Sequence, residues 1–218
     1  MRLGFFSGTG PEGKGLSLRF AAAGASVVLG SRDLQRASRA ADACNTVLGE
    51  PLILGMENRE LFSACNIIFL AVPYARAVDA VVDARPFLHA GQILVDVTVP
   101  LSFRGGGVEY LEQEGGSNSE IIARQLPAGI PLVAAFKTIP AGVLARLDAQ
   151  LNCDVFVCGD DAEAKRSVLE AASLIPSLRP LDAGPLRSAR ILERMTALAA
   201  WLNLHYKSKG ARYRIEGL

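Results

Sequence analysis

Three glycines near the start of the chain have the spacing of a phosphate-binding turn. They stand in the run Gly8-Thr9-Gly10-Pro11-Glu12-Gly13, which fits the pattern G-x-G-x-x-G. In that pattern the first glycine allows a tight turn, the second lets a diphosphate approach the backbone, and the third allows a helix to pack closely on a strand. Pro11 suits a first helical turn, because its missing N–H would have no partner there. The run predicts a dinucleotide site at a helix N-terminus.

The same run overlaps the start of a second phosphate-binding motif. Residues 8–14 also match G-x-x-x-x-G-K, the first part of a nucleoside triphosphate P-loop. That motif requires Ser or Thr at the next position, because the hydroxyl is a ligand of magnesium. This chain has Gly15 there. We therefore exclude the P-loop and keep the dinucleotide interpretation.

The end of the second expected strand, 26–30, indicates which dinucleotide binds. Enzymes that use NAD usually carry Asp or Glu there, which accepts a hydrogen bond from the ribose 2′-hydroxyl. Here the strand is followed by Ser31 and Arg32, and Arg36 lies one helical turn further on. A hydroxyl and two guanidinium groups suit a 2′-phosphate by geometry and by charge. These residues predict NADP(H); the alternative is that both arginines are ordinary residues of a solvated helix face.

Two further strand ends carry a proline that can shape a ligand-binding loop. Val72-Pro73 stands at the end of the expected strand 67–72, and Val99-Pro100 follows the expected strand 93–98. Ligands of open α/β sheets bind outside the carboxyl ends of the strands, where both pairs are expected. A proline is also a common way to end a strand. The sequence leaves these two interpretations equally open.

The elements that must position these residues alternate between strand and helix from residue 3 onward. Apolar runs at 3–7, 26–30, 67–72, 93–98 and 132–136 are separated by segments of mostly helical composition. This rhythm predicts an α/β fold of the Rossmann type, with a doubly wound, mostly parallel sheet. We assign residues 1–150 to an NADP-binding domain. Residues 151–218, with a long expected helix at 187–206, are assigned to a small C-terminal α/β portion that completes the substrate cleft.

Composition excludes several classes of function. The 218 residues carry 23 Lys+Arg against 22 Asp+Glu, a formal net charge of +1, so no overall field attracts nucleic acid or an anionic membrane. No apolar run approaches the roughly 18–20 residues of a membrane span. The four cysteines and two histidines lack metal-ligand spacing, and we expect no metal. We expect a cytoplasmic protein with reduced thiols.

Six runs spread along the chain carry a family resemblance. They are residues 8–16, 30–32, Val72-Pro73, 138–141, 158–161 and 178–186. Together they resemble the NADPH-dependent reductases of the deazaflavin coenzyme F-420, and the C-terminal runs are more specific than the glycine turn. The resemblance covers nearly the whole chain. It implies hydride transfer between NADP(H) and coenzyme F-420 in a homodimer.

The resemblance also implies which residues form the site. Direct hydride transfer depends on alignment rather than on acid–base chemistry, so we name no catalytic residue. The deazaflavin is expected above the nicotinamide, near the C-terminal helix and Lys137, Thr138, Ile139 and Pro140. The phosphates are expected at Thr9, Gly10, Pro11, Glu12, Ser31, Arg32 and Arg36, and the nicotinamide side is expected at Val72, Pro73, Arg76, Val99 and Ala141.

Two residues depart from what this pattern leads us to expect. Lys137 stands where the family members that the chain resembles typically have histidine, and Asp96 interrupts an apolar strand, where a buried carboxylate needs a partner. Lys137 has three interpretations: a contact to an anionic deazaflavin, the sign of a different acceptor, or a surface lysine at a strand end. The alternative functions are therefore an NADPH-dependent reductase of a small carbonyl, imine or pterin, and a non-catalytic NADPH-binding module.

Overall fold

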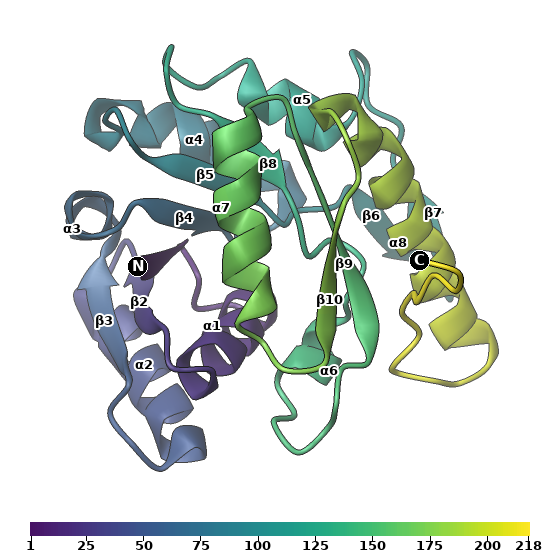
Figure 1. The fold of residues 1–218 in the computed structure, drawn as a ribbon, viewed down its shortest axis with the longest axis horizontal. Helices are drawn as coiled ribbons and strands as arrows, with labels where there is room; N and C mark the ends of the chain where they lie inside the picture. The colour runs from purple at the N-terminus through teal and green to yellow at the C-terminus, as the bar shows by residue number, and fades with distance from the viewer.

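A central sheet of eight strands runs through the computed structural model, which describes every residue from Met1 to Leu218 (Figure 1). The strand order is β10-β9-β8-β5-β4-β1-β2-β3, and all neighbouring strands are parallel except β8 and β9. The chain therefore starts inside the sheet and winds outward in both directions, which confirms the predicted doubly wound α/β fold. The strands of this sheet are β1 (Arg2–Phe6), β2 (Ser26–Ser31), β3 (Ile53–Glu57), β4 (Ile67–Leu70), β5 (Ile93–Asp96), β8 (Leu132–Ala134), β9 (Cys153–Gly159) and β10 (Leu178–Asp182).

Helices cover both faces of the sheet. Side chains of α1, α2, α6 and α7 belong to one buried apolar cluster, and side chains of α3, α4, α5 and α8 belong to a second. The two clusters lie on opposite faces, so the molecule has three layers. The α-helices are α1 (Pro11–Ala22), α2 (Leu34–Leu48), α3 (Asn58–Ala64), α4 (Ala77–Ala84), α5 (Asn118–Ala123), α6 (Ala141–Leu144), α7 (Ala162–Ser173) and α8 (Ala189–His205), and short 3-10 turns are η1 (Tyr74–Arg76), η2 (Arg85–Phe87) and η3 (Leu186–Ser188).

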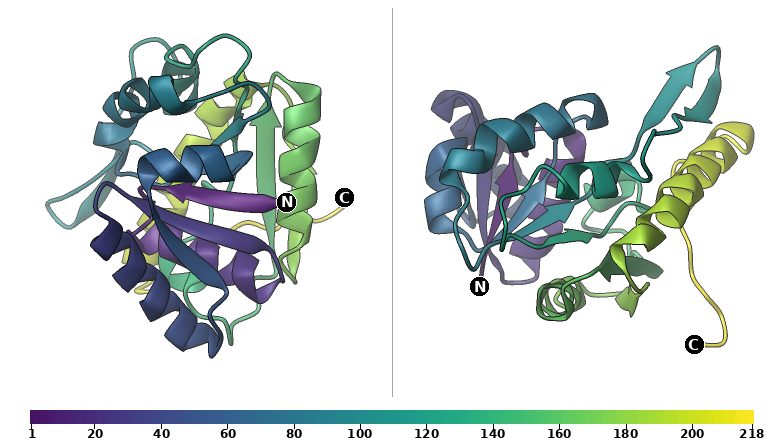
Figure 2. Two further views of the ribbon diagram at one scale, coloured as in Figure 1. Left: turned by 90° about the vertical axis from the view of Figure 1, so that its left-hand side faces the viewer. Right: turned by 90° about the horizontal axis from the view of Figure 1, so that it is seen from above.

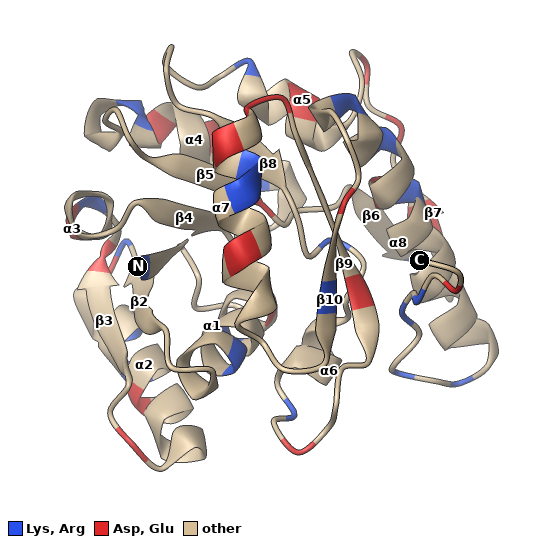
Figure 3. Ribbon diagram, viewed as in Figure 1, with Lys and Arg blue, Asp and Glu red and all other residues tan.

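Alternate residues of the central strands supply the two apolar clusters. In β4, Ile67 and Phe69 join the first cluster, whereas Ile68 and Leu70 join the second. Successive side chains of a strand point to opposite faces, so a strand covered on both sides is apolar throughout. This explains why the run 67–70 shows no polar alternation. Charged residues are accordingly few on the strands and are spread over the helices around them (Figure 3).

Side-chain caps fix where two of the helices begin. The Asp33 carboxylate accepts a hydrogen bond from the Arg36 N–H at 3.1 Å, as expected for the residue before α2. Ser117 and Glu120 form a reciprocal capping box at the start of α5. Asp33 lies two residues after the end of β2, and Ser117 lies in the loop between residue 110 and α5. The caps therefore set where each helix begins and the direction in which it leaves the preceding segment.

A β-hairpin that the sequence reasoning missed follows β5. Strands β6 (Leu101–Arg104) and β7 (Gly107–Tyr110) pair antiparallel across Gly105 and Gly106, which have φ of +59° and +77°. Two successive residues with positive φ are what a two-residue hairpin turn requires. The right-hand view of Figure 2 shows the hairpin projecting from the body of the molecule beside α8.

The C-terminal part of the chain extends the same sheet. The predicted boundary near residue 150 falls between β8, which ends at Ala134, and β9, which begins at Cys153, and β9 hydrogen-bonds to β8. The division into residues 1–150 and 151–218 stays a prediction. None of the helices combines the length and the apolar character that crossing a membrane would require.

Candidate active site

The glycine turn between β1 and α1 has the geometry that phosphate binding requires. A Cβ atom on Gly13 would lie 2.3 Å from the Gly8 carbonyl oxygen, so only glycine allows this approach of helix and turn. A Cβ on Gly10 would meet no protein atom within 4 Å. Gly10 is the residue before α1, and no side chain caps the helix there. The first N–H groups of α1 are thus open to an anion beside Gly10.

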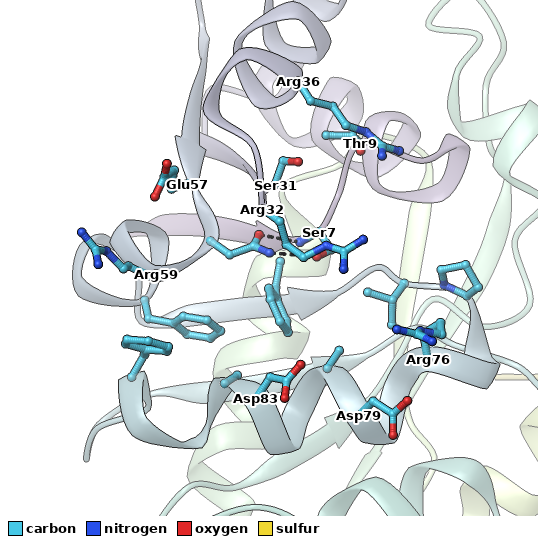
Figure 4. Close-up of a pocket in the computed structure, with 18 residues that line it drawn as sticks. Ser7, Thr9, Ser31, Arg32, Arg36, Glu57, Arg59, Arg76, Asp79 and Asp83 are labelled. Carbon is cyan, nitrogen blue, oxygen red and sulfur yellow. Dashed lines mark hydrogen bonds between the residues drawn. The ribbon is translucent and has the colours of Figure 1, made fainter.

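The turn borders a cavity of about 470 Å³, which we call the coenzyme cavity (Figure 4). Ser31 is buried at its wall, and Arg32 and Arg36 are exposed at its rim. Figure 4 shows the side chains of Arg32, Arg36 and Arg76 around the cavity, although Arg76 comes from a different segment of the chain than the other two. None of these three side chains makes a hydrogen bond or ion pair within the protein. They are therefore free to bind the phosphates of a dinucleotide.

A residue that the sequence analysis missed holds the floor of this cavity. Asn58, at the start of α3, accepts a hydrogen bond from the Ser7 N–H at 3.0 Å and donates one to the Ser7 hydroxyl at 2.9 Å (Figure 4). Ser7 has a φ of +53°, which is unusual for a residue with a side chain. The two bonds compensate for that conformation and fix the end of β1 before the glycine turn. No motif marks Asn58, because it is 51 positions from Ser7.

A second cavity, of about 580 Å³, lies on the other side of the α1 N-terminus, and we call it the substrate cavity. Residues 10–12 form one wall, residues 97–99 and 137–141 form the floor, and α8 forms the opposite wall. More than half of its lining residues are hydrophobic. An apolar cleft with a few polar groups suits a flat aromatic ring system.

The two cavities meet at Val72 and Pro73, which line both. Their shared wall is the loop after β4, at the carboxyl end of a central strand, as expected. Every predicted site residue lines one of the cavities except Gly8 and Gly13, which shape the turn. Thr9, Ser31, Arg32, Arg36 and Arg76 border the coenzyme cavity, whereas Gly10, Pro11, Glu12, Val99, Lys137, Thr138, Ile139, Pro140 and Ala141 border the substrate cavity.

Lys137 reaches the interior instead of the cavity. Its ammonium lies 2.8 Å from Oδ2 of Asp96 and 3.6 Å from Oε1 of Glu193, and it donates a hydrogen bond to the Thr98 carbonyl oxygen at 2.5 Å. The side chain of Lys137 is 1% exposed, and those of both carboxylates are fully buried. Lys137 is therefore the partner that the buried Asp96 needs, and both departures noted in the sequence belong to one interaction.

Hydrogen bonds satisfy the rest of this buried network. Ser119 donates to Asp96 at 2.6 Å, and the N–H groups of Asn118 and Ser119 donate to Glu193 at 3.1 and 3.2 Å. Tyr110 of the hairpin donates to Glu193 at 2.9 Å. Burial and the nearby Glu193 carboxylate raise the pKa of the Tyr110 hydroxyl, so it remains a donor. The network thus joins β5, β7, α5 and α8 beneath the floor of the substrate cavity.

This arrangement corrects the expectations for Lys137. A surface lysine is wrong, because the ammonium is buried among two carboxylates and a carbonyl. The ammonium is directed at these protein groups, so a contact to an anionic deazaflavin gains no support from this arrangement. The part of the chain at 137–140 still lines the substrate cavity. The Thr196 hydroxyl of α8 donates to the Lys137 carbonyl oxygen at 3.0 Å and holds that segment in place.

Sequence reasoning placed α8 near the substrate but did not name its contributing residues. Thr196, Ala199, Ala200 and Asn203 line the substrate cavity from α8, and Leu101 and Phe103 line it from the hairpin. Small residues four apart on one helix face were a usable signal for α8. The alternation of Leu101 and Phe103 with polar residues before two glycines was a usable signal for the hairpin.

Glu12 is the one carboxyl group that lines the substrate cavity, and it has no hydrogen-bond partner in the protein. Its Oε1 atom is buried and makes no hydrogen bond, although the residue as a whole is only partly buried. Burial raises the pKa of Glu12 to about 8 from its ordinary value near 4.5. The positive end of α1 favours the carboxylate and acts against this shift, but loss of hydration outweighs it. Glu12 therefore keeps its proton at neutral pH.

The chain is similar in sequence to two proteins over their full lengths. It is 34% identical to an F420-dependent NADP reductase of Methanocaldococcus jannaschii over 100% of this chain and 99% of that protein. It is 33% identical to an F420-dependent NADP reductase of Methanothermobacter thermautotrophicus over 100% of this chain and 96% of that protein. Residues 2–100 also match a family described as NADP oxidoreductase, coenzyme F420-dependent.

A solved structure has the same fold along the whole chain. The crystal structure of a protein from Arthrobacter sp. FB24, described as an F420 dependent NADP-reductase, aligns with a TM-score of 0.80. The alignment covers 98% of each chain at 24% sequence identity. Strands β9 and β10 and helix α8 are therefore part of a fold that exists in a known protein, and not an appendage specific to this chain.

Proposed function

The chain belongs to the family of F420-dependent NADP reductases, and on that premise we propose that it transfers a hydride between NADP(H) and the deazaflavin coenzyme F-420. One observation supports this function above the others: the coenzyme cavity and the substrate cavity meet at Val72 and Pro73. A dinucleotide whose phosphates lie at the glycine turn and at Arg32 has its nicotinamide at that junction. A ring system in the substrate cavity then faces the nicotinamide.

The residues of the chain perform this reaction mainly by alignment. The open N–H groups at the start of α1 bind the diphosphate, and Ser31, Arg32 and Arg36 bind the 2′-phosphate. Val72, Val99 and Ala141 hold the nicotinamide against the deazaflavin, whose ring lies on residues 137–140. Hydride transfer needs the two reacting carbons at about 3–3.5 Å, and the apolar walls exclude water from the space between them.

The buried position of Lys137 bears on the alternative acceptors. A small carbonyl, imine or pterin reductase would use Lys137 as an acid or an anchor for its substrate. Its ammonium is instead held by Asp96 and Glu193 beneath the cavity floor. That alternative has thus lost the residue on which it depended. A non-catalytic NADPH-binding module would have no use for an apolar cavity of about 580 Å³ at the nicotinamide.

We further propose a homodimer that works in the cytoplasm. Apolar side chains of α8 and the hairpin are exposed next to each other. Monomeric proteins rarely expose an apolar patch of this kind, so the patch supports a dimer interface. All four cysteines are buried and free, as is usual for proteins of a reducing compartment. Light scattering on the purified protein measures the dimer directly. The exposed apolar residues are Phe103, Ile191, Leu198, Trp201 and Leu204.

The experiment that tests the function follows the visible absorbance of oxidised F-420. The purified protein is mixed with NADPH and F-420, with NADH and a riboflavin-type flavin as controls. Rapid bleaching that requires NADPH is the expected result, with little reaction for either control. Tight NADPH binding without bleaching would overturn the proposal and return the search to other acceptors.

A further inference from the structure

The reaction proposed above moves a proton as well as a hydride. When NADPH reduces the deazaflavin, the C4–H bond of the dihydronicotinamide breaks, and the hydrogen leaves with its electron pair to form a C–H bond at C5. The displaced electrons pass through the conjugated ring to N1, which must then gain a proton. In the opposite direction N1 must lose one. A site that excludes water needs a side chain that can hold and release this proton.

Only three residues with ionisable side chains line the substrate cavity: Glu12, Tyr74 and Lys137. The Lys137 ammonium is engaged with Asp96 and Glu193 and is 1% exposed. Tyr74 lies in the short 3-10 turn after Pro73, and a phenol is a much weaker acid than a carboxylic acid. The threonine hydroxyls and the Asn203 amide do not ionise at neutral pH. This leaves Glu12 as the group that suits the task.

The surroundings of Glu12 differ from those of every other buried carboxylate. Asp96 and Glu193 are paired with Lys137 and accept several hydrogen bonds, and Asp154 is paired with Arg179 at 2.8 Å. The carboxyl of Glu12 makes no hydrogen bond, and its Oε1 is buried. Native proteins rarely leave a buried polar atom without a partner, because the lost hydration is not replaced. The hydrogen-bond partner of Glu12 is therefore expected to be the ligand that occupies the substrate cavity.

We propose that Glu12 donates the proton to N1 of the deazaflavin when NADPH reduces it, and takes that proton back in the reverse reaction; this inference rests on the proposed function. The Glu12 O–H bond breaks as the N1–H bond forms, and the carboxylate regains its proton from water at the cavity mouth. The overall balance is NADPH, F-420 and one proton on one side, and NADP⁺ and the two-electron-reduced coenzyme on the other.

The charges around the site favour this role. The diphosphate expected at the turn places negative charge beside Glu12 at the same end of α1, and a like charge favours the protonated form. Arg32, Arg36 and Arg76 border the neighbouring coenzyme cavity, where the coenzyme phosphates neutralise them. Glu12 therefore remains an acid when NADPH is bound. Once Glu12 has given its proton to N1, the resulting carboxylate can act as the base in the reverse reaction.

Glu12→Gln tests the proposal because it keeps the size and the hydrogen-bonding ability of the side chain but cannot transfer a proton. The turnover number kcat of F-420 reduction is measured from pH 6 to pH 10 for the wild type and the variant. In the wild type, kcat falls at or above pH about 8, where Glu12 loses its proton, and the reverse reaction speeds up over the same range. In Glu12→Gln, kcat is lower by about 10²-fold or more, and the dependence on Glu12 disappears from its pH profile.

Two controls separate this role from effects on folding or binding. NADPH fluorescence gives the dissociation constant of the coenzyme, which stays close to the wild-type value in Glu12→Gln. Glu163→Gln changes the equivalent second position of α7, where the side chain is 84% exposed, and leaves kcat and its pH profile as in the wild type. A loss of kcat in Glu12→Gln with unchanged NADPH binding is thus a loss of chemistry.

The outcomes also separate this proposal from the proposed function. If the wild type does not reduce F-420 at all, the function is wrong. If the wild type reduces F-420 and Glu12→Gln keeps its kcat and pH profile, the function stands and the proton-transfer role of Glu12 is overturned. Tyr74→Phe decides between the two candidate donors. Loss of the pH-dependent step in Tyr74→Phe, with the step intact in Glu12→Gln, would also overturn the role of Glu12.

Discussion

The ammonium of Lys137 and the carboxylate of Asp96 form a buried ion pair at 2.8 Å, although 41 positions separate them in the sequence. Asp96 ends β5, and Lys137 follows β8, the strand hydrogen-bonded to β5. The pair thus joins the ends of two neighbouring strands at the edge of the sheet where the substrate cavity lies. Glu193 of α8 is the third member and ties the opposite wall to the same point.

Removal of Lys137 is expected to destabilise the protein rather than to weaken substrate binding specifically. Lys137→Met leaves Asp96 and Glu193 buried without a cation, which costs about 3–5 kcal/mol. Urea unfolding measures this loss. Lys209→Met, at an exposed lysine without a partner, is the matched control and leaves the unfolding free energy nearly unchanged. A variant as stable as the wild type, but with a raised KM for F-420, would contradict this structural role.

Alanine at two glycines of the phosphate-binding turn should give opposite results. Gly13→Ala places a Cβ 2.3 Å from the Gly8 carbonyl oxygen, so the turn must shift and the unfolding free energy falls. Gly10→Ala meets no protein atom and leaves stability unchanged, but its methyl group occupies the space of the diphosphate. Thermal unfolding and NADPH titration distinguish the two. Unimpaired NADPH binding by Gly10→Ala would show that the phosphates lie elsewhere.

Arg32 is expected to select NADPH over NADH. Arg32→Asp removes a cation from the 2′-phosphate and adds a repelling charge. Since each charge-assisted hydrogen bond contributes about 1.5–3 kcal/mol, the NADPH affinity should fall at least about tenfold. NADH affinity stays the same or improves.

Arg39 provides the control for that measurement. It lies on α2 with Arg36, is exposed, and does not line the coenzyme cavity. Arg39→Asp changes the net charge of the protein by the same amount, so it reveals any general electrostatic effect. Equal losses of NADPH affinity in Arg32→Asp and Arg39→Asp would show that Arg32 does not bind the 2′-phosphate specifically.

Glu120 gives the protein a predictable sensitivity to acid. Hydrogen bonds from the Arg190 guanidinium at 2.7 Å lower the pKa of Glu120 to about 2 from its ordinary value near 4.5. Its contribution to stability is complete above pH about 4.5, where the unfolded chain is also ionised. As the pH falls from there towards 2, the unfolded state binds a proton that the folded state does not, and stability is lost.

Urea unfolding between pH 6 and pH 3 measures this effect. Glu120→Gln should lower the unfolding free energy at pH 6 and make it fall less steeply with acid than in the wild type. Glu50→Gln, at an exposed carboxylate without a side-chain partner, should keep the wild-type slope. Parallel slopes in the wild type and Glu120→Gln would rule out Glu120 as a source of the acid sensitivity.

The sequence determines the sheet and the coenzyme cavity more fully than the substrate cavity. Most residues that form the coenzyme cavity lie in short runs directly after strands, so the order of strands and helices places them. The side chain of Lys137 could not be placed in this way. It follows a strand like the others, but its direction depends on Asp96 and Glu193, which are distant in sequence and become its neighbours only through folding. Asn58 was missed for the same reason.

The two cavities require different lengths of chain. The residues that line the coenzyme cavity lie between Phe6 and Phe87, whereas those of the substrate cavity extend from Gly10 to Leu204. On the ribosome, all lining residues of the coenzyme cavity are therefore synthesised within the first half of these 218 residues. The wall formed by α8 is added only when residues 189–205 have been made. Only a chain synthesised through α8 can bring a second coenzyme to the nicotinamide, so NADPH bound to a shorter nascent chain lacks the complete substrate cavity for its reaction partner.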